Sequence, residues 1–523
     1  MNAIDYLIVI FYLALMVYLG VRFKKNSESN DYFLGGKNFG WFSLCLSTMA
    51  TQLSVISFVS APAFVGLREG GGMQWLTFEF GVPLAMIILI TVIGPVLYNS
   101  GIVSVYEFLE KRFNRTSRLL ISSMFLISRS FATGVTIYAV GLILSSILQI
   151  SFWQTMVIVG FITIIYSLEG GMKAIVYSEV AQMIIKFMGI IIIIIAGLYY
   201  IGGWGNFLTH LDYDRLTVID FSKTGFDGSE YGFFPMLFGG IFLYTSYYGT
   251  DQIQVQRLLS AKNELTVKKL LLFNGLFRFP ITLAYCFGGL ILGAFANSNQ
   301  SFANLIPAEK PDLMIPLFIT NYLPHGIIGV IVVAIIAAGM SAYSSTLNSL
   351  SAVTMEDFVT KKWDTSGKKY VLYSKLTGLG WGILTMFFAF YVGDIAKTVI
   401  EAINKIGSMF YGPILAMFLL AIVGNKIKAT AANIGLVCGV LTNVVIWLFF
   451  ENIFWFWWNA IGALVTLFLG TLISFILPQQ SKVSNSKITL GKLFVKENLI
   501  LFVFFLLIIT FCYLLPMVLV KPN

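Results

Sequence analysis

The chain has 523 residues, of which 58% are hydrophobic and 11% are charged, and its formal net charge is +9. Apolar stretches of about 20 residues recur from end to end, which excludes a soluble domain and indicates a protein of many membrane-spanning helices. The basic residues lie mainly in short loops, so the positive charge does not indicate a nucleic-acid partner. The sequence suggests the lipid bilayer as its surroundings and gives no sign of an obligatory protein partner.

The hydropathy pattern predicts an all-α membrane protein with about 14 transmembrane helices. The first of them lacks a basic segment before it and a cleavage-like site after it, so we interpret it as a retained helix and not as a signal peptide. The expected helices are 4–22, 40–66, 74–98, 119–148, 152–168, 174–203, 232–250, 271–296, 325–357, 371–392, 395–422, 428–450, 453–477 and 498–519.

Basic residues concentrate in the loops that follow the odd-numbered helices. Examples are Lys24 and Lys25 after the first helix, Lys111 after the third, and Lys361 and Lys362 after the ninth. The positive-inside rule therefore predicts a multi-pass protein of the cell membrane (inner or plasma membrane) with both termini outside. The longest outer loop, 204–231, is too short to hold a separate catalytic domain.

Two of the expected helices carry residues that interrupt a helix. Segment 40–66 runs through Ser47, Thr48, Thr51, Gln52, Ser54 and Ser57 before Pro62, and segment 232–250 contains Gly239 and Gly240. These segments are five helices apart and run in opposite directions, which is the pattern of a five-plus-five inverted repeat with a central binding site. We predict a single membrane domain over 1–523, with 4–22 flanking, 40–203 as the first repeat, 232–422 as the second and 428–519 as additional helices.

Segment 330–358 is a long apolar helix that carries Ser341, Ser344 and Ser345. Their spacing places three hydroxyls on one face of the helix. In hydrocarbon such a face either packs closely against another helix or holds a cation through oxygen atoms. Ala50 and Leu53, in the interrupted part of segment 40–66, add two backbone carbonyls. A site of about five neutral oxygens without a carboxylate suits a monovalent ion such as sodium better than a divalent ion.

Several motifs, in order along nearly the whole chain, make it resemble the sodium/solute symporter family, in particular its bacterial sodium/sialic acid and sodium/sugar symporters. The motifs that carry this resemblance are DYFLGGKNFGWFSLCLS (31–47), ATQLSVISF (50–58), SVYEFLEKRFN (104–114), YSLEGGMKAIVYSEVAQ (166–182), YYGTDQIQVQRLLSAK (247–262), AAGMSAYSSTLNS (337–349) and NKIGSMFYGPILAMFLL (404–420). The resemblance implies a LeuT-like inverted-repeat core with broken second and seventh helices, and sodium-driven symport of a small organic solute by alternating access.

The resemblance also implies binding residues for the ion. The family's sodium site falls on Ala50, Leu53, Ser341, Ser344 and Ser345. A second sodium site of some members falls on Glu179, Ser344 and Ser345, with Glu in place of the family's Asp. Lys186 lies seven residues from Glu179, about 10 Å along a helix, so we do not expect a tight pair between them.

The substrate side chains implied by the resemblance lie mostly on the second expected helix. They are Gln52, Ser54, Ser57, Gln74 and Arg129, with Glu79, Tyr247, Tyr248 and Asp251 as further candidates. Arg129 is a charge within a membrane helix, which indicates a functional site. Its guanidinium either binds a substrate carboxylate through two parallel hydrogen bonds or pairs with a protein carboxylate. We expect Arg278 to be structural or to reach toward the membrane surface.

We therefore predict a carboxylated sugar of the sialic acid type as the favoured solute, with neutral sugars or polyols and monocarboxylates as alternatives. The sequence has no HExxH, phosphate-loop or GxSxG motif, and nothing else in it favours an enzyme. Rival hypotheses from other classes are a sodium channel and a solute sensor. A proton-coupled carrier of the same fold, with a proton on Glu179, is a further alternative.

Overall fold

The computed structural model describes residues 1–24, 32–360, 363, 367–391, 399–424, 426–477 and 491–519. Lys25, Lys361 and Lys362, and the start of the predicted helix 395–422, lie outside these ranges. Within them the protein is a bundle of helices, and no β-strand occurs in this part of the chain apart from one isolated bridge between Phe39 and Ala261. The predicted all-α class is confirmed.

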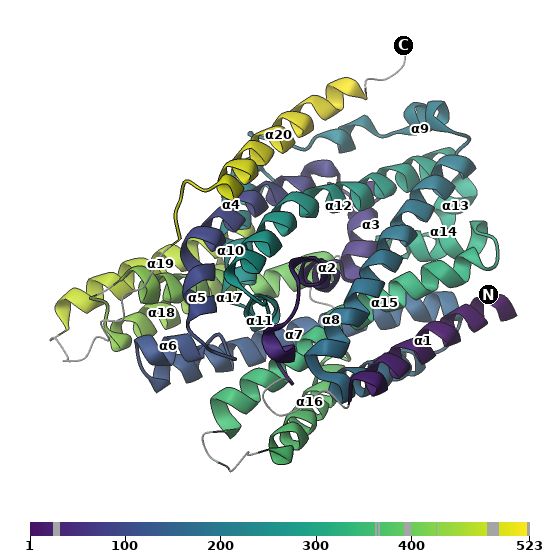
Figure 1. Ribbon diagram of the computed structural model, residues 1–523. Coiled ribbons are helices and arrows are strands. Elements are labelled where there is room, and N and C mark those ends of the chain that lie inside the picture. Colours follow the sequence, from purple (N-terminus) through teal and green to yellow (C-terminus); the bar gives the residue numbers. More distant parts are fainter. Residues whose placement is uncertain are drawn as a thin grey trace.

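The main helices follow the apolar segments (Figure 1). They are α1 (Ala3–Phe23), α2 (Trp41–Gln52), α3 (Ala61–Gly66), α4 (Gly81–Ile88), α5 (Gly94–Asn99), α6 (Glu107–Arg112), α7 (Arg115–Leu148), α8 (Phe152–Tyr200), α10 (Phe233–Gly249), α11 (Gln252–Leu259), α12 (Glu264–Ser298), α13 (Gln300–Leu305), α14 (Met314–Tyr322), α15 (Ile327–Val353), α16 (Lys368–Phe388), α17 (Val399–Val423), α18 (Ala429–Phe449), α19 (Phe456–Ile476) and α20 (Lys496–Val518). Short helical turns, among them η3 (Ile56–Ser60), η4 (Met73–Phe80) and η8 (Thr354–Val359), connect several of these helices.

Among the described residues, 11 helices are long and apolar enough to cross a membrane, or 12 with one bent pair, so the predicted number of 14 is not confirmed. Part of the difference lies in α8, whose 49 residues cover two predicted helices. Gly171 has a φ of 56° there, and a straight helix of this length would be about 74 Å long, more than twice the hydrocarbon thickness. Helix α10 has 17 residues and is slightly shorter than the 11 helices that are long enough to span a membrane.

The predicted break in the second spanning segment is confirmed. Helix α2 ends at Gln52, Leu53 has a non-helical ψ of 70°, and the direction changes by 65° before the chain continues through η3 and α3. Ser57 Oγ donates to the carbonyl of Gln52 across this break, at 3.3 Å. Leu53 O does not accept a hydrogen bond within its own helix, so this carbonyl is left for another partner.

The corresponding break in the other half lies between α10 and α11. Thr250 leaves the helical conformation, and Asp251 begins α11 as its N-cap, with Oδ1 accepting from the backbone N–H of Ile253 at 2.8 Å. Gly239 and Gly240, which the sequence analysis named as the interruption of this segment, lie inside the continuous helix α10, so the predicted position of this break is wrong and the chain leaves the helix only at Thr250. Leu53 and Asp251, at the two breaks, are both buried. This arrangement brings polar backbone and side-chain groups to the centre of an otherwise apolar protein.

Helix α15 packs against α8, α7, α1 and α2 and is buried along most of its length. The peripheral helices α1, α16 and α20 expose large apolar side chains, as membrane-facing helices do. Figure 1 shows α20 lying across the outside of α4 and α12. The breaks and the serine face of α15 therefore meet in the buried centre of the bundle.

Candidate functional site

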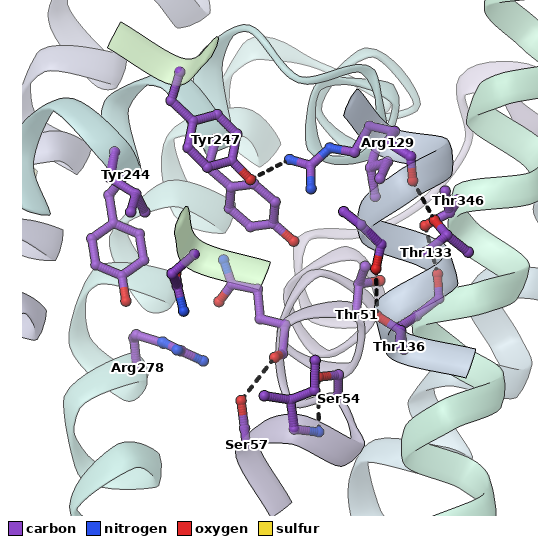
Figure 2. Close-up of a pocket in the computed structure, with 18 of the residues that line it drawn as sticks. Thr51, Ser54, Ser57, Arg129, Thr133, Thr136, Tyr244, Tyr247, Arg278 and Thr346 are labelled. Atoms are coloured by element: carbon purple, nitrogen blue, oxygen red, sulfur yellow. Dashed lines mark hydrogen bonds between the residues drawn. The ribbon is translucent and has the colours of Figure 1, made fainter. Parts of the chain in front are cut away.

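A cavity of about 150 Å³ lies beside the two helix breaks. Residues from both halves of the chain surround it, and Figure 2 shows the labelled side chains around this common space. The polar and aromatic residues that line it are Thr51, Gln52, Ser54, Ser57, Trp75, Phe78, Arg129, Thr133, Thr136, Tyr244, Tyr247, Arg278, Tyr285, Thr346, Asn404 and Tyr411. Four of the five predicted substrate residues are among them, namely Gln52, Ser54, Ser57 and Arg129.

Arg129 lies on α7 at the edge of this cavity and is only partly free for a ligand. Its guanidinium forms an ion pair with Asp251, and its Nη2 donates to the hydroxyl of Tyr411 at 2.6 Å. The rings of Tyr247 and Tyr411 lie 5.3 and 5.2 Å from the guanidinium carbon. Pairing with a protein carboxylate, one of the two alternatives from the sequence, is thus present, and Nη1 makes no hydrogen bond to a described residue.

Other donors converge on the same cavity. The carboxamide of Gln52 and the hydroxyl of Tyr244 are buried and have no hydrogen-bond partner among the described residues. Tyr247 accepts from Gln254 Nε2 at 2.9 Å, which leaves its own hydroxyl proton for a ligand. Since buried polar groups without partners are costly, these groups indicate a polar ligand with several acceptor atoms.

Some predicted substrate residues are not part of this arrangement. Gln74 does not line the cavity, because η4 turns its side chain toward Gly70, whose carbonyl accepts from Nε2 at 2.6 Å. Glu79 accepts hydrogen bonds from Arg278 at 3.2 Å and from Thr282 at 3.0 Å. Arg278 is therefore buried in an ion pair and does not reach toward the membrane surface.

The predicted sodium ligands lie together, and a lysine ammonium is bound to three of them. Lys186 Nζ, on α8, donates to Ala50 O at 2.6 Å, to Leu53 O at 2.9 Å and to Ser341 Oγ at 2.6 Å. Ser344 instead donates to Ser341 O at 3.2 Å. The side chain of Lys186 is completely buried. Its hydrogen-bond partners lie on α2 and α15 and not on its own helix. Glu179, seven residues away on α8, is paired with Arg257 instead, in agreement with the expectation that Lys186 and Glu179 do not form a tight pair.

These oxygens do not fit a sodium ion while the ammonium is present. An ammonium group has three protons, and three acceptors receive them here, so its hydrogen-bonding capacity is complete. A second positive charge about 4 Å away would be repelled by about 4 kcal/mol at an effective dielectric constant of 20. The sodium oxygens and the ammonium are therefore alternatives for one position.

The predicted second sodium set is also bound to a basic side chain. Glu179 forms a buried ion pair with Arg257 of α11, whose Nη2 lies 2.7 Å from both carboxylate oxygens. Ser345 donates to Glu179, and Arg257 Nε donates to Ser47 Oγ at 2.8 Å. The structure brings Glu179 and Ser345 together, as expected, and Ser344 is not part of this cluster.

The sequence interpretation missed the partners of these charged residues. Arg257 lies within the motif at 247–262, but its pairing with Glu179 spans 78 positions and leaves no local spacing signal. Asp251 was a substrate candidate and is the partner of Arg129, 122 positions away. The sequence offered one signal for such pairs, namely several charged residues within apolar segments. Buried charges are generally paired, so this signal indicates that these residues are one another's partners.

The comparisons with known proteins now identify the family. The family model of the sodium:solute symporter family matches residues 32–439. The chain belongs to this family. It is 29% identical over 454 residues to sodium-coupled monocarboxylate transporter 2 of Bos taurus, covering 86% of this chain and 70% of that protein. It is 30% identical over 444 residues to sodium-coupled monocarboxylate transporter 1 of Xenopus laevis, covering 83% and 70%.

Solved structures agree with the fold. A Na⁺-coupled sialic acid symporter in a substrate-bound, outward-open state has a TM-score of 0.81 and 26% identity, covering 91% of this chain and 98% of that chain. A nucleobase-cation-symport-1 family transporter has a TM-score of 0.55 and 12% identity, covering 90% and 97%, and shows the fold alone. The protein is a multi-pass membrane transporter with a LeuT-like fold and not an enzyme. At the level of the family, these similarities support sodium as the coupling ion.

Proposed function

We propose that the protein is a secondary transporter that moves a small organic carboxylate across the membrane by alternating access. The observation that carries this proposal is the charge around the cavity. Two basic side chains, Arg129 and Arg278, are among the residues that line it, whereas the carboxylates that pair with them, Asp251 and Glu79, are not. Basic groups at the wall of a buried cavity favour an anionic ligand.

The available hydrogen-bond donors favour the same class of solute. Arg129 Nη1, Gln52 Nε2 and the hydroxyl of Tyr247 are directed to one cavity and match the acceptor oxygens of a carboxylate. Both relatives named above are monocarboxylate transporters, and the structurally similar symporter is named for sialic acid, which also carries a carboxylate. Monocarboxylates, an alternative at the sequence level, thus stand beside carboxylated sugars as the solutes to be tested first.

The test is uptake into proteoliposomes of labelled L-lactate, pyruvate and N-acetylneuraminate, with labelled D-glucose as the neutral solute. Saturable uptake of at least one carboxylate, without uptake of glucose, supports the proposal. Uptake of glucose alone would contradict the carboxylate assignment and favour a sugar or polyol transporter. Conductance of sodium without any solute uptake would favour the channel hypothesis.

Gln52 provides the most specific variant for this test. Its carboxamide lies beside the Tyr248 hydroxyl and makes no hydrogen bond of good geometry to a described residue, so Gln52→Ala mainly removes a ligand contact, and we expect KM for the carboxylate to rise about 10-fold to 100-fold. Gln74→Ala is the matched control, because Gln74 is bonded to Gly70 outside the cavity. An unchanged KM in Gln52→Ala, or an equal rise in both variants, would remove Gln52 from the binding site.

A further inference from the structure

The Lys186 ammonium connects the two elements between which the predicted sodium site lies. Its acceptors are two carbonyls at the break of α2 and one hydroxyl on α15, so it links the broken helix to the serine face. Ser341 Oγ also donates to Ala50 O at 2.9 Å, which closes the ring of contacts. A positive charge at this place satisfies the exposed carbonyls that a bound ion would otherwise satisfy.

We propose that Lys186 takes the place of the sodium ion at this site. Solute transport by this chain then needs no sodium at these oxygens. The chain keeps the cation-binding oxygens of its family and uses them to hold a cation of its own.

The surroundings of Lys186 contain few other groups that titrate. On its own helix these are Glu179, which is paired with Arg257 of α11, and Tyr166, which donates to Met340 O. Helix α1 contributes Tyr12, which accepts from Gln182. Cys45 of α2 and Tyr343 of α15 face other partners, namely Asn274 and Gly382. Among the described residues, Lys186 is thus the basic group bonded to the oxygens of the break.

An independent observation supports the replacement of sodium. The second predicted sodium set, around Glu179 and Ser345, is held by the guanidinium of Arg257, which is 1% exposed. Each of the two sets of oxygens therefore has its own basic side chain, from α8 in one case and from α11 in the other. Arginine stays protonated under all ordinary conditions, so the second set of oxygens permanently holds a positive charge of the protein.

The inference concerns the ion and not the solute, and only its second test rests on the proposed function.

The first test needs no solute, so it is independent of the proposed function. Thermal unfolding of the purified full-length protein is measured in sodium chloride and in choline chloride at equal ionic strength. We expect the same Tm in both salts for the wild type. Lys186→Ala frees the oxygens, so we expect sodium to raise its Tm by about 2 °C or more relative to choline.

The control is Lys262→Ala, which removes an exposed lysine between α11 and α12 and should behave as the wild type. A sodium-specific rise of Tm in the wild type would overturn the proposal, and this result does not depend on whether the variant folds. A folded Lys186→Ala protein that gains no sodium response would likewise contradict the assignment of these oxygens.

The second test uses labelled L-lactate, pyruvate and N-acetylneuraminate in sodium-free proteoliposomes. We expect the transported carboxylate to enter at the same rate in sodium-free proteoliposomes as in sodium-containing ones. Uptake that needs sodium would overturn the replacement of sodium by Lys186. If none of the three solutes is taken up under any ionic condition, the proposed solute class is wrong, and the thermal measurement still decides the role of Lys186.

Discussion

At the scale of single residues, the interior is organised by charges that have definite partners. Arg257 and Glu179 are 1% and 0% exposed, and their pairing includes two contacts of 2.7 Å. Such a pair gains little net stability over apolar residues of the same shape, because both ions had to leave water. Losing one partner is much more costly, since the remaining charge stays buried without compensation.

The Glu179–Arg257 pair therefore predicts a strong non-additivity of substitutions. We expect Glu179→Gln and Arg257→Met each to destabilise the protein by about 3–5 kcal/mol, because each leaves one buried polar or charged group without its partner. The double variant should be clearly more stable than the sum of the two single effects predicts. Thermal unfolding of all four proteins in one detergent measures the coupling.

Additive effects in this cycle would mean that the two side chains do not interact in the folded protein. That result would contradict the buried pair. A matched reference is the exposed pair of Lys268 and Glu264, one helical turn apart, whose side chains are 31% and 45% exposed. Removal of either of these should change stability by less than about 0.5 kcal/mol.

The limits of sequence reasoning are clearest at this scale. The oxygens of Ala50, Leu53 and Ser341 were correctly expected to lie together, because a helix break and a serine face are visible in the sequence. The ammonium that binds them was not expected, because Lys186 was considered only in relation to Glu179 on the same helix, whereas its partners lie on other helices. A lysine side chain reaches to neighbouring helices, and helical spacing does not tell which helix is adjacent.

At the scale of elements, close backbone approach determines how the broken segment is held. Helices α3 and α12 meet at glycines: a Cβ on Gly289 would lie 2.4 Å from Pro62 O, and one on Gly66 would lie 2.4 Å from Gly289 O. Small residues of this kind are the usual means by which membrane helices approach each other closely. The tight contact fixes α3 while α2, on the other side of the break, contacts the ammonium.

This contact predicts different effects for two adjacent glycines. Gly289→Ala should destabilise the protein by about 1–3 kcal/mol, because backbone atoms have to move apart. Gly288→Ala is the matched control: the nearest atom to its new Cβ is a side-chain carbon of Ile194 at 3.5 Å. Thermal unfolding checks both, and equal stability of the two variants would contradict the close packing of α3 on α12.

The break after Gln52 was predictable from the sequence, because clustered hydroxyl residues before a Pro in an apolar segment are a local signal. The break at Thr250 was not, because Gly239 and Gly240 pack inside a continuous helix. The number of spanning helices was less predictable. The break at Gly171 joins two apolar stretches within one continuous helix assignment, and α10, with 17 residues, is shorter than the helices that are long enough to span the membrane. The boundaries of the two repeats remain a prediction.

At the scale of the whole molecule, ion-pair clusters connect the two predicted repeats at opposite ends of the bundle. At one end, next to α3, Arg68 binds Glu401 at 2.6 Å. Burial acts to lower the pKa of Arg68, but the nearby Tyr231, Glu401 and Glu230 outweigh it and raise this pKa above its ordinary value. At the other end, Arg118 of α7 binds Asp357 of η8 with its Nε at 2.8 Å. In Figure 1 α3 lies far from α6, which is beside the second cluster.

Alternating access requires that these two ends open in turn, so each cluster should hold one end closed. We expect Asp357→Asn to lengthen and broaden the distance between spin labels at Lys111 and Lys368, which are exposed on α6 and α16. Glu401→Gln should leave that distance unchanged and loosen the opposite end. Electron–electron resonance measures both variants after the native cysteines have been replaced. Equal effects of the two substitutions on this label pair would contradict separate gates.

The central claim is that a side chain of the protein holds the position of the coupling ion in a sodium:solute symporter fold. The most direct measurement is uptake of radioactive sodium into proteoliposomes during transport of the carboxylate solute. The account predicts that solute entry brings no sodium with it in the wild type. Entry of sodium in a fixed ratio to the solute would contradict it and would show that Lys186 leaves these oxygens during the cycle.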